Sequence, residues 1–354
     1  MLYHFSLYLK QYISLFNVVH YVSFRVMAAL LSSLGLFLVL GPWFITQSKR
    51  FFRSKSREYT PKTHRVKDNM PTMGGLFILS VVAINVLLWT NLCDMRAWIF
   101  LLGILAFGVI GFFDDWSKIR HKKGMSAAVK FGSQWIIALC VGVGLLYCKG
   151  ISTALIFPFF KSFQPDLGLF FVPWAAFVIV GCSNAVNLTD GLDGLAIGSL
   201  MPNFATFLII AYAAGNCRIA HYLHIPFACS AEVAVIGAIM LGASIGFLWF
   251  NAYPAQIFMG DVGSLSLGAG LAMMALMAKQ ELLLIIAGGL FVVETISVVA
   301  QVFSFKILGR RIFKMAPIHH HFELLGWPES RIATRFGIIS FVLCLLALIT
   351  LKIR

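Results

Sequence analysis

The chain contains ten apolar runs of about the length that a helix needs to cross a bilayer, and they fill most of its 354 residues. A spanning helix takes roughly 20 predominantly apolar residues. The runs lie at residues 22–46, 72–91, 97–113, 127–148, 172–187, 195–214, 231–250, 262–278, 282–304 and 333–352. With 60% hydrophobic residues, the composition excludes an ordinary soluble domain. We therefore predict an all-α, polytopic integral membrane protein with about ten transmembrane helices in a single domain, residues 1–354.

Two segments outside these runs differ from the rest in composition. Residues 1–21 are rich in aromatic side chains, which indicates an interfacial N-terminal segment at the membrane surface. A cleaved signal peptide fits less well, because no small-residue cleavage pattern follows a short apolar core. Residues 305–332 are more polar and contain three consecutive histidines, so we expect a loop outside the bilayer. The closely spaced runs 172–187 and 195–214 could be broken or tilted helices.

The distribution of basic residues predicts the orientation in the membrane. An even number of spans places both termini on one side, and the connecting loops alternate between the two faces. Of the 28 Lys and Arg residues, 17 lie in the loops 47–71, 114–126 and 305–332, and 8 lie on the other face. Because cytoplasmic loops carry the excess of basic residues, these three loops should be cytoplasmic and both termini periplasmic.

The formal net charge of +14 could suggest nucleic-acid binding. The basic residues lie between apolar runs and form no separate basic domain, so we expect no nucleic acid as a partner. In a membrane protein, the same excess predicts attraction to anionic membrane lipids and anionic substrates. The seven cysteines show no metal-type spacing and are interpreted as small core residues.

Five aspartates lie at the ends of apolar runs, all on the basic face. Asp114 and Asp115 end the third run, Asp190 and Asp193 separate the fifth from the sixth, and Asp261 opens the eighth. Acids at membrane depth are costly and indicate function by default. A single one could be a helix cap or a solubilising loop residue, but five on one face favour a site. Adjacent carboxylates repel, so a divalent cation or nearby lysines must compensate the first pair.

Two glycine-containing turns carry three of these acids. In N-L-T-D-G-L-D-G, residues 187–194, the glycines permit close backbone approach and expose N–H groups that can hold an anion or a nucleobase edge. In F-M-G-D-V-G-S-L, residues 258–265, Asp261 follows Gly260 at the expected start of a helix. Its carboxylate could cap that helix. It could equally bind Mg²⁺, which takes one or two carboxylates together with phosphate and water.

The remaining motifs lie in the basic loops. In M-A-P-I-H-H-H-F-E, residues 315–323, we expect an extended or loop conformation after Pro317. A zinc site formed by this run alone is not expected, because the histidines lack the i, i+4 spacing. Charged imidazoles there could bind phosphate. In K-D-N-M-P-T-M-G-G, residues 67–75, Lys67 and Thr72 should face the same vestibule as the acids, whereas topology-determining charge explains most of the preceding basic residues.

Taken together, these motifs resemble those of the phospho-N-acetylmuramoyl-pentapeptide-transferase family, the lipid I synthases also called translocase I, in the polyprenyl-phosphate N-acetylhexosamine-1-phosphate transferase superfamily. The motifs, in the family's order, are P-T-M-G-G, D-D-W-S-K, N-L-T-D-G-L-D-G-L-A, F-M-G-D-V-G-S-L and M-A-P-I-H-H-H-F-E-L-L-G-W-P-E, between about Arg65 and Trp327. The resemblance implies a Mg²⁺-dependent enzyme of peptidoglycan synthesis. It would transfer phospho-N-acetylmuramoyl-pentapeptide from UDP-N-acetylmuramoyl-pentapeptide to undecaprenyl phosphate, yielding lipid I and UMP. It also implies a homodimer in the bacterial inner membrane with a cytoplasmic active site.

The resemblance further implies roles for individual residues. Asp261 resembles the metal ligand, Asp114 and Asp115 resemble the catalytic aspartates beside the lipid phosphate, and Phe258 resembles the ring that stacks on uracil. His320 is placed with the catalytic residues. The other matching positions are expected to bind substrate: Lys67, Thr72, Lys118, Lys122, Lys130, Asn187, Asp190, Gly191, Leu192, Asp193, Asn251, Gly260, Gln301, His319 and His321.

Two alternative functions are considered. A sister polyprenyl-phosphate N-acetylhexosamine-1-phosphate transferase would share the aspartate motifs and differ in its sugar. Residues 316–323 favour the muramoyl-pentapeptide enzyme, because by resemblance this loop carries the sugar preference. An ion-coupled transporter would hold its acids near the bilayer midplane on broken helices, whereas the five aspartates lie at the ends of spans. Glu294, inside the ninth run, is the one acid that fits transport better.

Overall fold

The computed structural model describes residues 1–51, 70–121, 123–148, 150–160 and 163–352. Its helices are α1 Leu2–Leu9, η1 Ser14–His20, α2 Val22–Phe51, α3 Gly74–Trp89, α4 Met95–His121, α5 Ala127–Leu146, η3 Gly168–Phe170, α6 Phe171–Thr189, α7 Leu195–Ala214, α8 Cys217–Leu223, α9 Ala231–Asn251, α10 Gly260–Met277, η4 Glu281–Leu283, α11 Leu284–Ala287, α12 Gly289–Leu308, α13 Ile318–Leu324 and α14 Glu329–Thr350. Over the described ranges there is no strand, and Ala154 and Asp166 form an isolated bridge. The predicted all-α fold class is confirmed.

Nine helices in the described part of the chain are long and apolar enough to cross a membrane. They are α2, α4, α5, α6, α7, α9, α10, α12 and α14. A tenth, α3, is equally apolar but has only 16 residues. These ten helices coincide with the ten predicted runs, and the chain is a polytopic membrane protein.

Two boundaries differ from the prediction. The third run was expected to end at residue 113, but α4 continues to His121, and basic residues in its last turn favour the negative end of the helix dipole. The run 282–304 is interrupted at Gly288, where α11 ends and α12 begins. Residues 1–21 form two short helices, α1 and η1, and residues 305–332 include α13.

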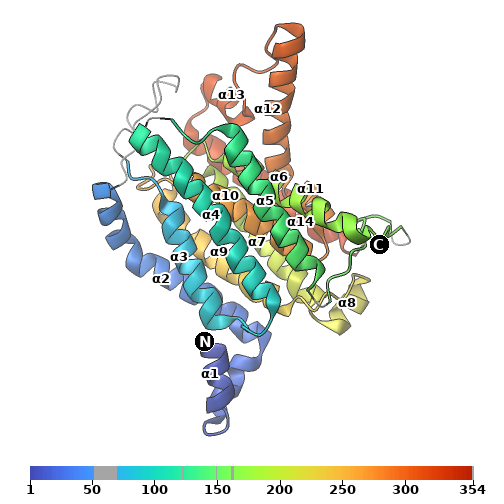
Figure 1. Ribbon diagram of the computed structural model, residues 1–354. Coiled ribbons are helices and arrows are strands. Elements are labelled where there is room, and N and C mark those ends of the chain that lie inside the picture. The colour runs from blue at the N-terminus through green and yellow to red at the C-terminus, as the bar shows by residue number, and fades with distance from the viewer. Residues whose placement is uncertain (52–69, 122, 149, 161–162, 353–354) are drawn as a thin grey trace.

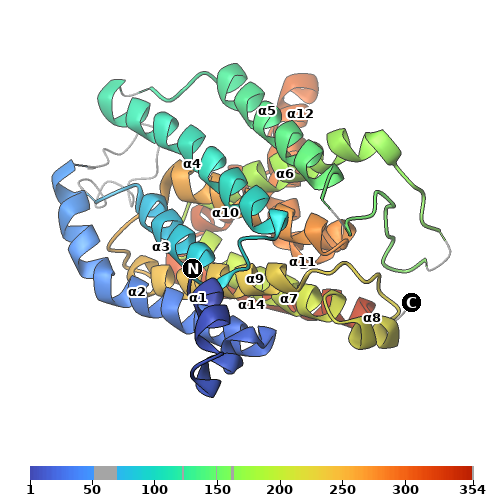
Figure 2. The ribbon, with the colours of Figure 1, turned by 60° about the horizontal axis from the view of Figure 1, so that its bottom comes forward.

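Helix α10 lies at the centre of the bundle, with α3, α4, α6 and α9 around it (Figures 1 and 2). All of its residues from Val262 to Met277 are buried. Glycines let the neighbouring helices approach α10 until the backbones are in contact. A Cβ on Gly111 of α4 would lie 2.4 Å from the Asp261 carbonyl oxygen, and one on Gly75 of α3 would lie 2.1 Å from the Gly263 nitrogen. Small residues at helix contacts are how membrane helices pack closely.

At the opposite end of the bundle, a buried ion pair joins α2 to α9. Two nitrogens of Arg25 lie 2.8 Å from the two carboxylate oxygens of Glu232. The backbone N–H of Asn91, in the α3–α4 connection, also donates to this carboxylate at 2.9 Å. Burying a charge is tolerated when it is paired and hydrogen-bonded, and here the pairing ties three segments together.

Replacing Gly111 with Ala should destabilise the protein, because the added Cβ would press on the backbone of α10. Overpacking of this kind costs about 1–3 kcal/mol. Gly132→Ala on α5 is the matched control, since no atom lies within 4 Å of its Cβ and alanine is the better helix former. Thermal unfolding in detergent measures both. Equal melting temperatures for the two variants would contradict the backbone contact.

Candidate functional site

A cavity of about 580 Å³ opens on the side of the bundle where α4 and α6 finish and α5 and α10 begin. Polar and charged side chains dominate its wall. Its lining residues are Thr72, Asp114, Lys118, Gly124, Met125, Ala127, Lys130, Asn187, Asp190, Gly191, Leu192, Asn251, Phe258, Gly260 and Asp261. Twelve of these fifteen are residues that the sequence predicted for the site; ten belong to four separate motifs, and Lys130 and Asn251 lie outside them. The fold therefore brings four of the five predicted motifs together in one cavity.

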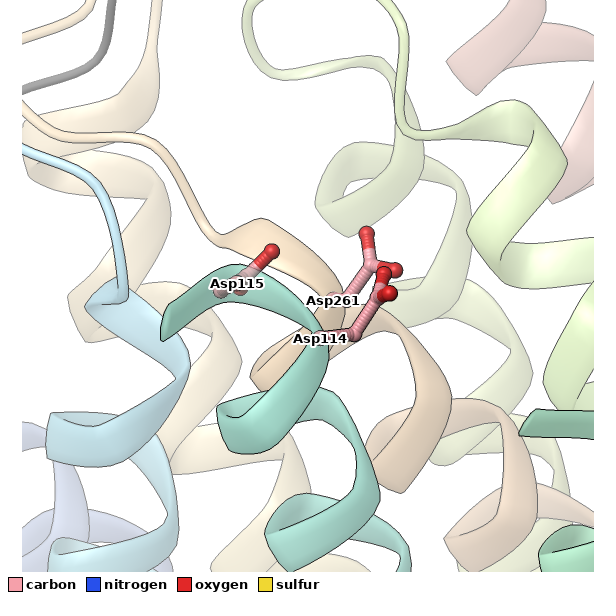
Figure 3. A group of neighbouring side chains, drawn as sticks. All are labelled: Asp114, Asp115 and Asp261. Atoms are coloured by element: carbon pink, nitrogen blue, oxygen red, sulfur yellow. The ribbon is translucent and has the colours of Figure 1, made fainter. Parts of the chain in front are cut away.

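Three carboxylates meet at this cavity. Asp114 and Asp115 lie near the end of α4, and Asp261 lies in the first turn of α10. One oxygen from each lies within 4.8 Å of the others. Asp114 and Asp261 point toward one another, and Asp115 is set apart from them (Figure 3). The close approach of α4 to α10 at Gly111 fixes this arrangement.

Two lysines neutralise part of this negative charge. Lys118 Nζ lies 2.7 Å from Asp114 Oδ2, 3.2 Å from Asp115 Oδ1 and 3.0 Å from Asp261 Oδ2. Lys130, from α5, lies 3.3 Å from Asp114 Oδ2 and also contacts the Asp261 carboxylate. Among the described residues, two ammonium groups therefore face three carboxylates, and the charges of these five groups sum to −1 when all are ionised.

This donor set fits a divalent cation. Carboxylate oxygens are the hard ligands that Mg²⁺ prefers, and Mg²⁺ usually takes only one or two of them beside phosphate and water. Asp114, Asp115 and Asp261 are the residues that could hold the ion. Asp261 is also the residue for which the sequence left both a capping and a metal-binding role open; its contacts are with lysines and Asn187, which favours the second.

The backbone also shapes the site. The N–H of Met125 donates to Asp114 Oδ1 at 2.7 Å, which fixes that carboxylate against the α4–α5 turn. Gly260 adopts φ 72°, and a Cβ there would lie 2.5 Å from Asp115 Oδ2. A left-handed conformation and a close contact together require glycine at this position. Met125, Gly124 and Ala127 were not predicted, because a backbone donor or a close approach leaves no signal in the side-chain type.

Asn187 connects α6 to α10. Its Nδ2 donates to Asp261 Oδ1 at 3.1 Å and to Ser264 Oγ at 2.8 Å. Ser264 lies three residues after Asp261, on the same side of α10, so helical spacing within the motif could have identified it. The amide of Asn187 thus orients one oxygen of the central carboxylate.

The turn between α6 and α7 forms another part of the wall. Asp190, Gly191 and Leu192 line the cavity as predicted. Burial raises the pKa of Asp190 to about 8, and the negative charges of neighbouring aspartates add to this effect. Its carboxyl group is therefore largely protonated in neutral solution and can donate a hydrogen bond.

Two of the predicted residues mainly hold this turn in place. Asp193 does not line the cavity; its Oδ2 accepts a hydrogen bond from the Ala255 N–H at 3.1 Å. Asn251 lines the cavity, and its side chain bridges the turn and the loop before α10, accepting from the Gly194 N–H at 3.1 Å and donating to the Ile257 carbonyl at 2.8 Å.

Phe258 links this loop to the P-T-M-G-G segment. Its N–H donates to the Pro71 carbonyl at 3.0 Å, and its carbonyl accepts from the Gly74 N–H at 2.8 Å. Thr72 and Phe258 therefore line the same part of the cavity. The predicted neighbours Lys67 and Lys122 lie outside the described residues.

The histidine run lies beside the cavity in a helix. The expected extended conformation is wrong, because Pro317 takes the extended N-cap position and the chain enters α13 immediately afterwards. Among the described lining residues none is a histidine. His320 Nδ1 lies 3.0 Å from Glu323 Oε2, and His321 Nδ1 accepts from the Lys314 N–H at 3.2 Å.

His319 packs against Gly191, a residue of the cavity wall, but does not itself line the cavity. It is fully buried, and its Nε2 would lie 2.4 Å from a Cβ on Gly191. Its Nδ1 lies 3.1 Å from Oε2 of Glu294, which is also fully buried. Glu294, considered above as a transport acid, is thus the partner of a histidine packed against the site. No sequence spacing connects a residue of α12 with one of α13.

Gln301 is also on α12, but it holds the following loop and does not line the cavity. Its Oε1 accepts from the Phe313 N–H at 2.9 Å and the Ile312 N–H at 3.1 Å, and its Nε2 donates to the Phe313 carbonyl at 3.1 Å. Gln301 therefore sets the path of the chain between α12 and α13.

Comparison with known proteins agrees with this arrangement. The model of Glycosyl transferase family 4 matches residues 97–279, which include α4 to α10. Phospho-N-acetylmuramoyl-pentapeptide-transferases from Citrifermentans bemidjiense and Aquifex aeolicus are each 49% identical to this chain, and that from Pelobacter propionicus is 46% identical. Each of these matches covers the full length of both chains. The chain therefore belongs to the phospho-N-acetylmuramoyl-pentapeptide-transferase family.

Proposed function

We propose that this protein transfers phospho-N-acetylmuramoyl-pentapeptide from UDP-N-acetylmuramoyl-pentapeptide to undecaprenyl phosphate, giving lipid I and UMP in peptidoglycan synthesis. The observation that carries the proposal is the cluster of Asp114, Asp115, Asp261, Lys118 and Lys130 in a cavity at the end of a membrane bundle. Such a position is accessible to a water-soluble nucleotide and to a lipid phosphate in the same leaflet.

The chemistry of the reaction explains why charge is concentrated here. A phosphomonoester carries about −1.5 to −2 charges at pH 7, so the lipid phosphate needs little activation. The main obstacle is its repulsion by the donor diphosphate, since two like unit charges 4 Å apart repel by about 4 kcal/mol at an effective dielectric of 20. Lys118 and Lys130 would oppose this repulsion. A Mg²⁺ ion bound by the three aspartates would supply further charge neutralisation.

Roles for the remaining residues follow from their places in the cavity. The nucleoside would occupy the wall formed by Thr72, Asn187, Asp190 and Asn251, with Phe258 offering a ring for uracil. A protonated Asp190 could donate a hydrogen bond to it. The glycines Gly191 and Gly260 leave room for substrate atoms close to the backbone.

The acceptor's isoprenoid chain would occupy an apolar cleft between α6 and α12. This cleft has a volume of about 240 Å³ and is lined by residues that include Phe177, Cys182, Ala185, Phe291 and Ile296. Ala185 is one helical turn before Thr189, at the end of α6 that carries Asn187. A lipid tail in this cleft would therefore bring its head group toward the carboxylates.

The orientation in the membrane is also part of this proposal. Exposed basic residues lie at the end of the bundle that carries the site, at the end of α4 and after α12. They include Arg120, Lys123, Arg310 and Arg311. Basic residues concentrate on the cytoplasmic side. The active site would then face the cytoplasm of the bacterial inner membrane, where the nucleotide donor is present, and both termini would be periplasmic.

The structure gives transport little support. Glu294, the acid that fitted transport best, lies with its Oε2 3.1 Å from His319 Nδ1 beside the cavity. The other clustered acids are at helix ends. The sister hexosamine-phosphate transferase has no support from the named relatives.

Donor preference tests the proposed reaction. Purified protein supplied with undecaprenyl phosphate should release UMP from UDP-N-acetylmuramoyl-pentapeptide and not from UDP-N-acetylglucosamine. The reverse preference would assign the chain to the sister activity. Solute uptake into liposomes without any UMP release would instead favour transport.

Asp261→Asn should lower the rate of UMP release by about 100-fold or more, as expected when a charged group that stabilises the transition state is lost. Its dependence on Mg²⁺ concentration should also weaken. Asp166→Asn is the matched control, because Asp166 lies in the exposed connection between α5 and α6, where its side chain accepts hydrogen bonds from nearby Thr153 and Gly168. Similar rates for the two variants would refute the metal-ligand assignment.

Glu294→Gln should lower turnover about tenfold, since loss of the carboxylate beside Nδ1 allows His319 to shift against Gly191. A double-mutant cycle with His319→Asn tests this coupling. If Glu294 acts through His319, the double variant should be no slower than the slower single variant. If the fold-loss in turnover of the double variant equals the product of the two single losses, the two residues act separately.

A further inference from the structure

The C-terminal half of α12 extends past the ends of the neighbouring helices (Figure 1). Its apolar side chains are exposed on every side of the helix. They are Val299, Val302, Phe303, Phe305, Ile307 and Leu308, each between 47% and 63% exposed. A helix that is apolar all round needs an apolar environment, and a surface of this size does not face water. In a membrane protein, that environment is the hydrocarbon of the bilayer.

The helix ends abruptly, and the chain folds back beside it. Gly309 has φ 65° and terminates α12 in a left-handed conformation. The Ser304 hydroxyl donates to the Arg310 carbonyl at 2.8 Å, and Gln301 accepts hydrogen bonds from the Ile312 and Phe313 N–H groups. These bonds fix Arg310 and Arg311 next to the last turn of the apolar helix.

Three basic residues therefore lie where the apolar helix ends. Lys306, Arg310 and Arg311 are exposed, and within the described parts of the chain none of them forms an ion pair with a carboxylate. The end of a membrane-embedded apolar helix is at the level of the lipid head groups. Lys306, in the last turn, can extend its ammonium group to the same level. The guanidinium group pairs with phosphate in a planar, bidentate geometry.

We propose that residues 306–311 bind the phosphate groups of anionic phospholipids in the leaflet next to the active site. The apolar C-terminal half of α12 lies in the hydrocarbon of the bilayer, and the three basic residues bind the negatively charged head groups. Helix α12 also carries Glu294, which lies beside His319 of α13. This lipid contact would therefore keep α12 and α13 at a constant depth in the membrane beside the cavity.

A tryptophan reporter tests the proposal. Ile307→Trp places an indole beside Arg310 on the exposed side of the helix end. The full-length protein is reconstituted in phosphatidylcholine nanodiscs that contain a minor fraction of brominated phosphatidylglycerol or brominated phosphatidylcholine. The fluorescence of the added tryptophan is measured after subtraction of the signal from protein without the reporter. Brominated phosphatidylglycerol should quench it more strongly than brominated phosphatidylcholine, with a preference of about five-fold for each contributing arginine. The preference should fall as salt is raised.

Substitutions separate charge from structure. Arg310→Gln with Arg311→Gln should lower the preference by about five-fold for each arginine removed and leave the part that Lys306 supplies, whereas Lys at both positions should retain the preference that comes from charge. Lys10→Gln with Arg218→Gln removes the same charge from exposed positions on α1 and α8, and should leave the preference unchanged. Equal quenching by both lipids in the parent reporter protein would overturn the proposal. So would displacement of brominated phosphatidylglycerol by trace undecaprenyl phosphate, which would assign the site to the lipid substrate.

Discussion

The backbone contact between α10 and the helices around it is the constraint on which the site depends. Gly111 and Gly75 let α4 and α3 approach α10 more closely than any side chain would allow. That approach puts the carboxylates of α4 beside the first turn of α10. In a bilayer, where helices gain little from hydrophobic association with one another, this close packing is a main source of stability. The bundle and the site are therefore stabilised by the same contacts.

Charge at membrane depth is tolerated here only because it is paired. Lys118 and Lys130 contact the aspartates from two different helices, and Asn187 and the Met125 N–H satisfy further carboxylate oxygens. The same rule explains Arg25 with Glu232 at the other end of the bundle. Each pair joins segments that are distant in sequence, so the cost of burying charge is offset and the arrangement of the helices becomes specific.

Much of this could be predicted from the sequence, because the spans are continuous apolar runs and the acids stand out against them. The ten spans were predicted correctly, and twelve of the fifteen residues that line the cavity had been named from the sequence. The helical course of α4 past residue 113 was missed, since a charged stretch after an apolar run resembles a loop. The histidine helix was missed because Pro317 can begin a helix as well as prevent one. The pairing of Glu294 with His319 depends on how α12 and α13 pack, which no local pattern encodes.

The position of Lys118 has a consequence for how ligands would enter. Its ammonium group contacts all three carboxylates and serves as an internal counter-ion. An incoming metal ion must compete with this tethered cation, while an incoming phosphate attracts it. With the proposed Mg²⁺, each ligand would make room for the other if Lys118 turned from carboxylate to phosphate. Such favourable coupling is reciprocal, so the nucleotide should tighten metal binding by the same factor by which the metal tightens nucleotide binding.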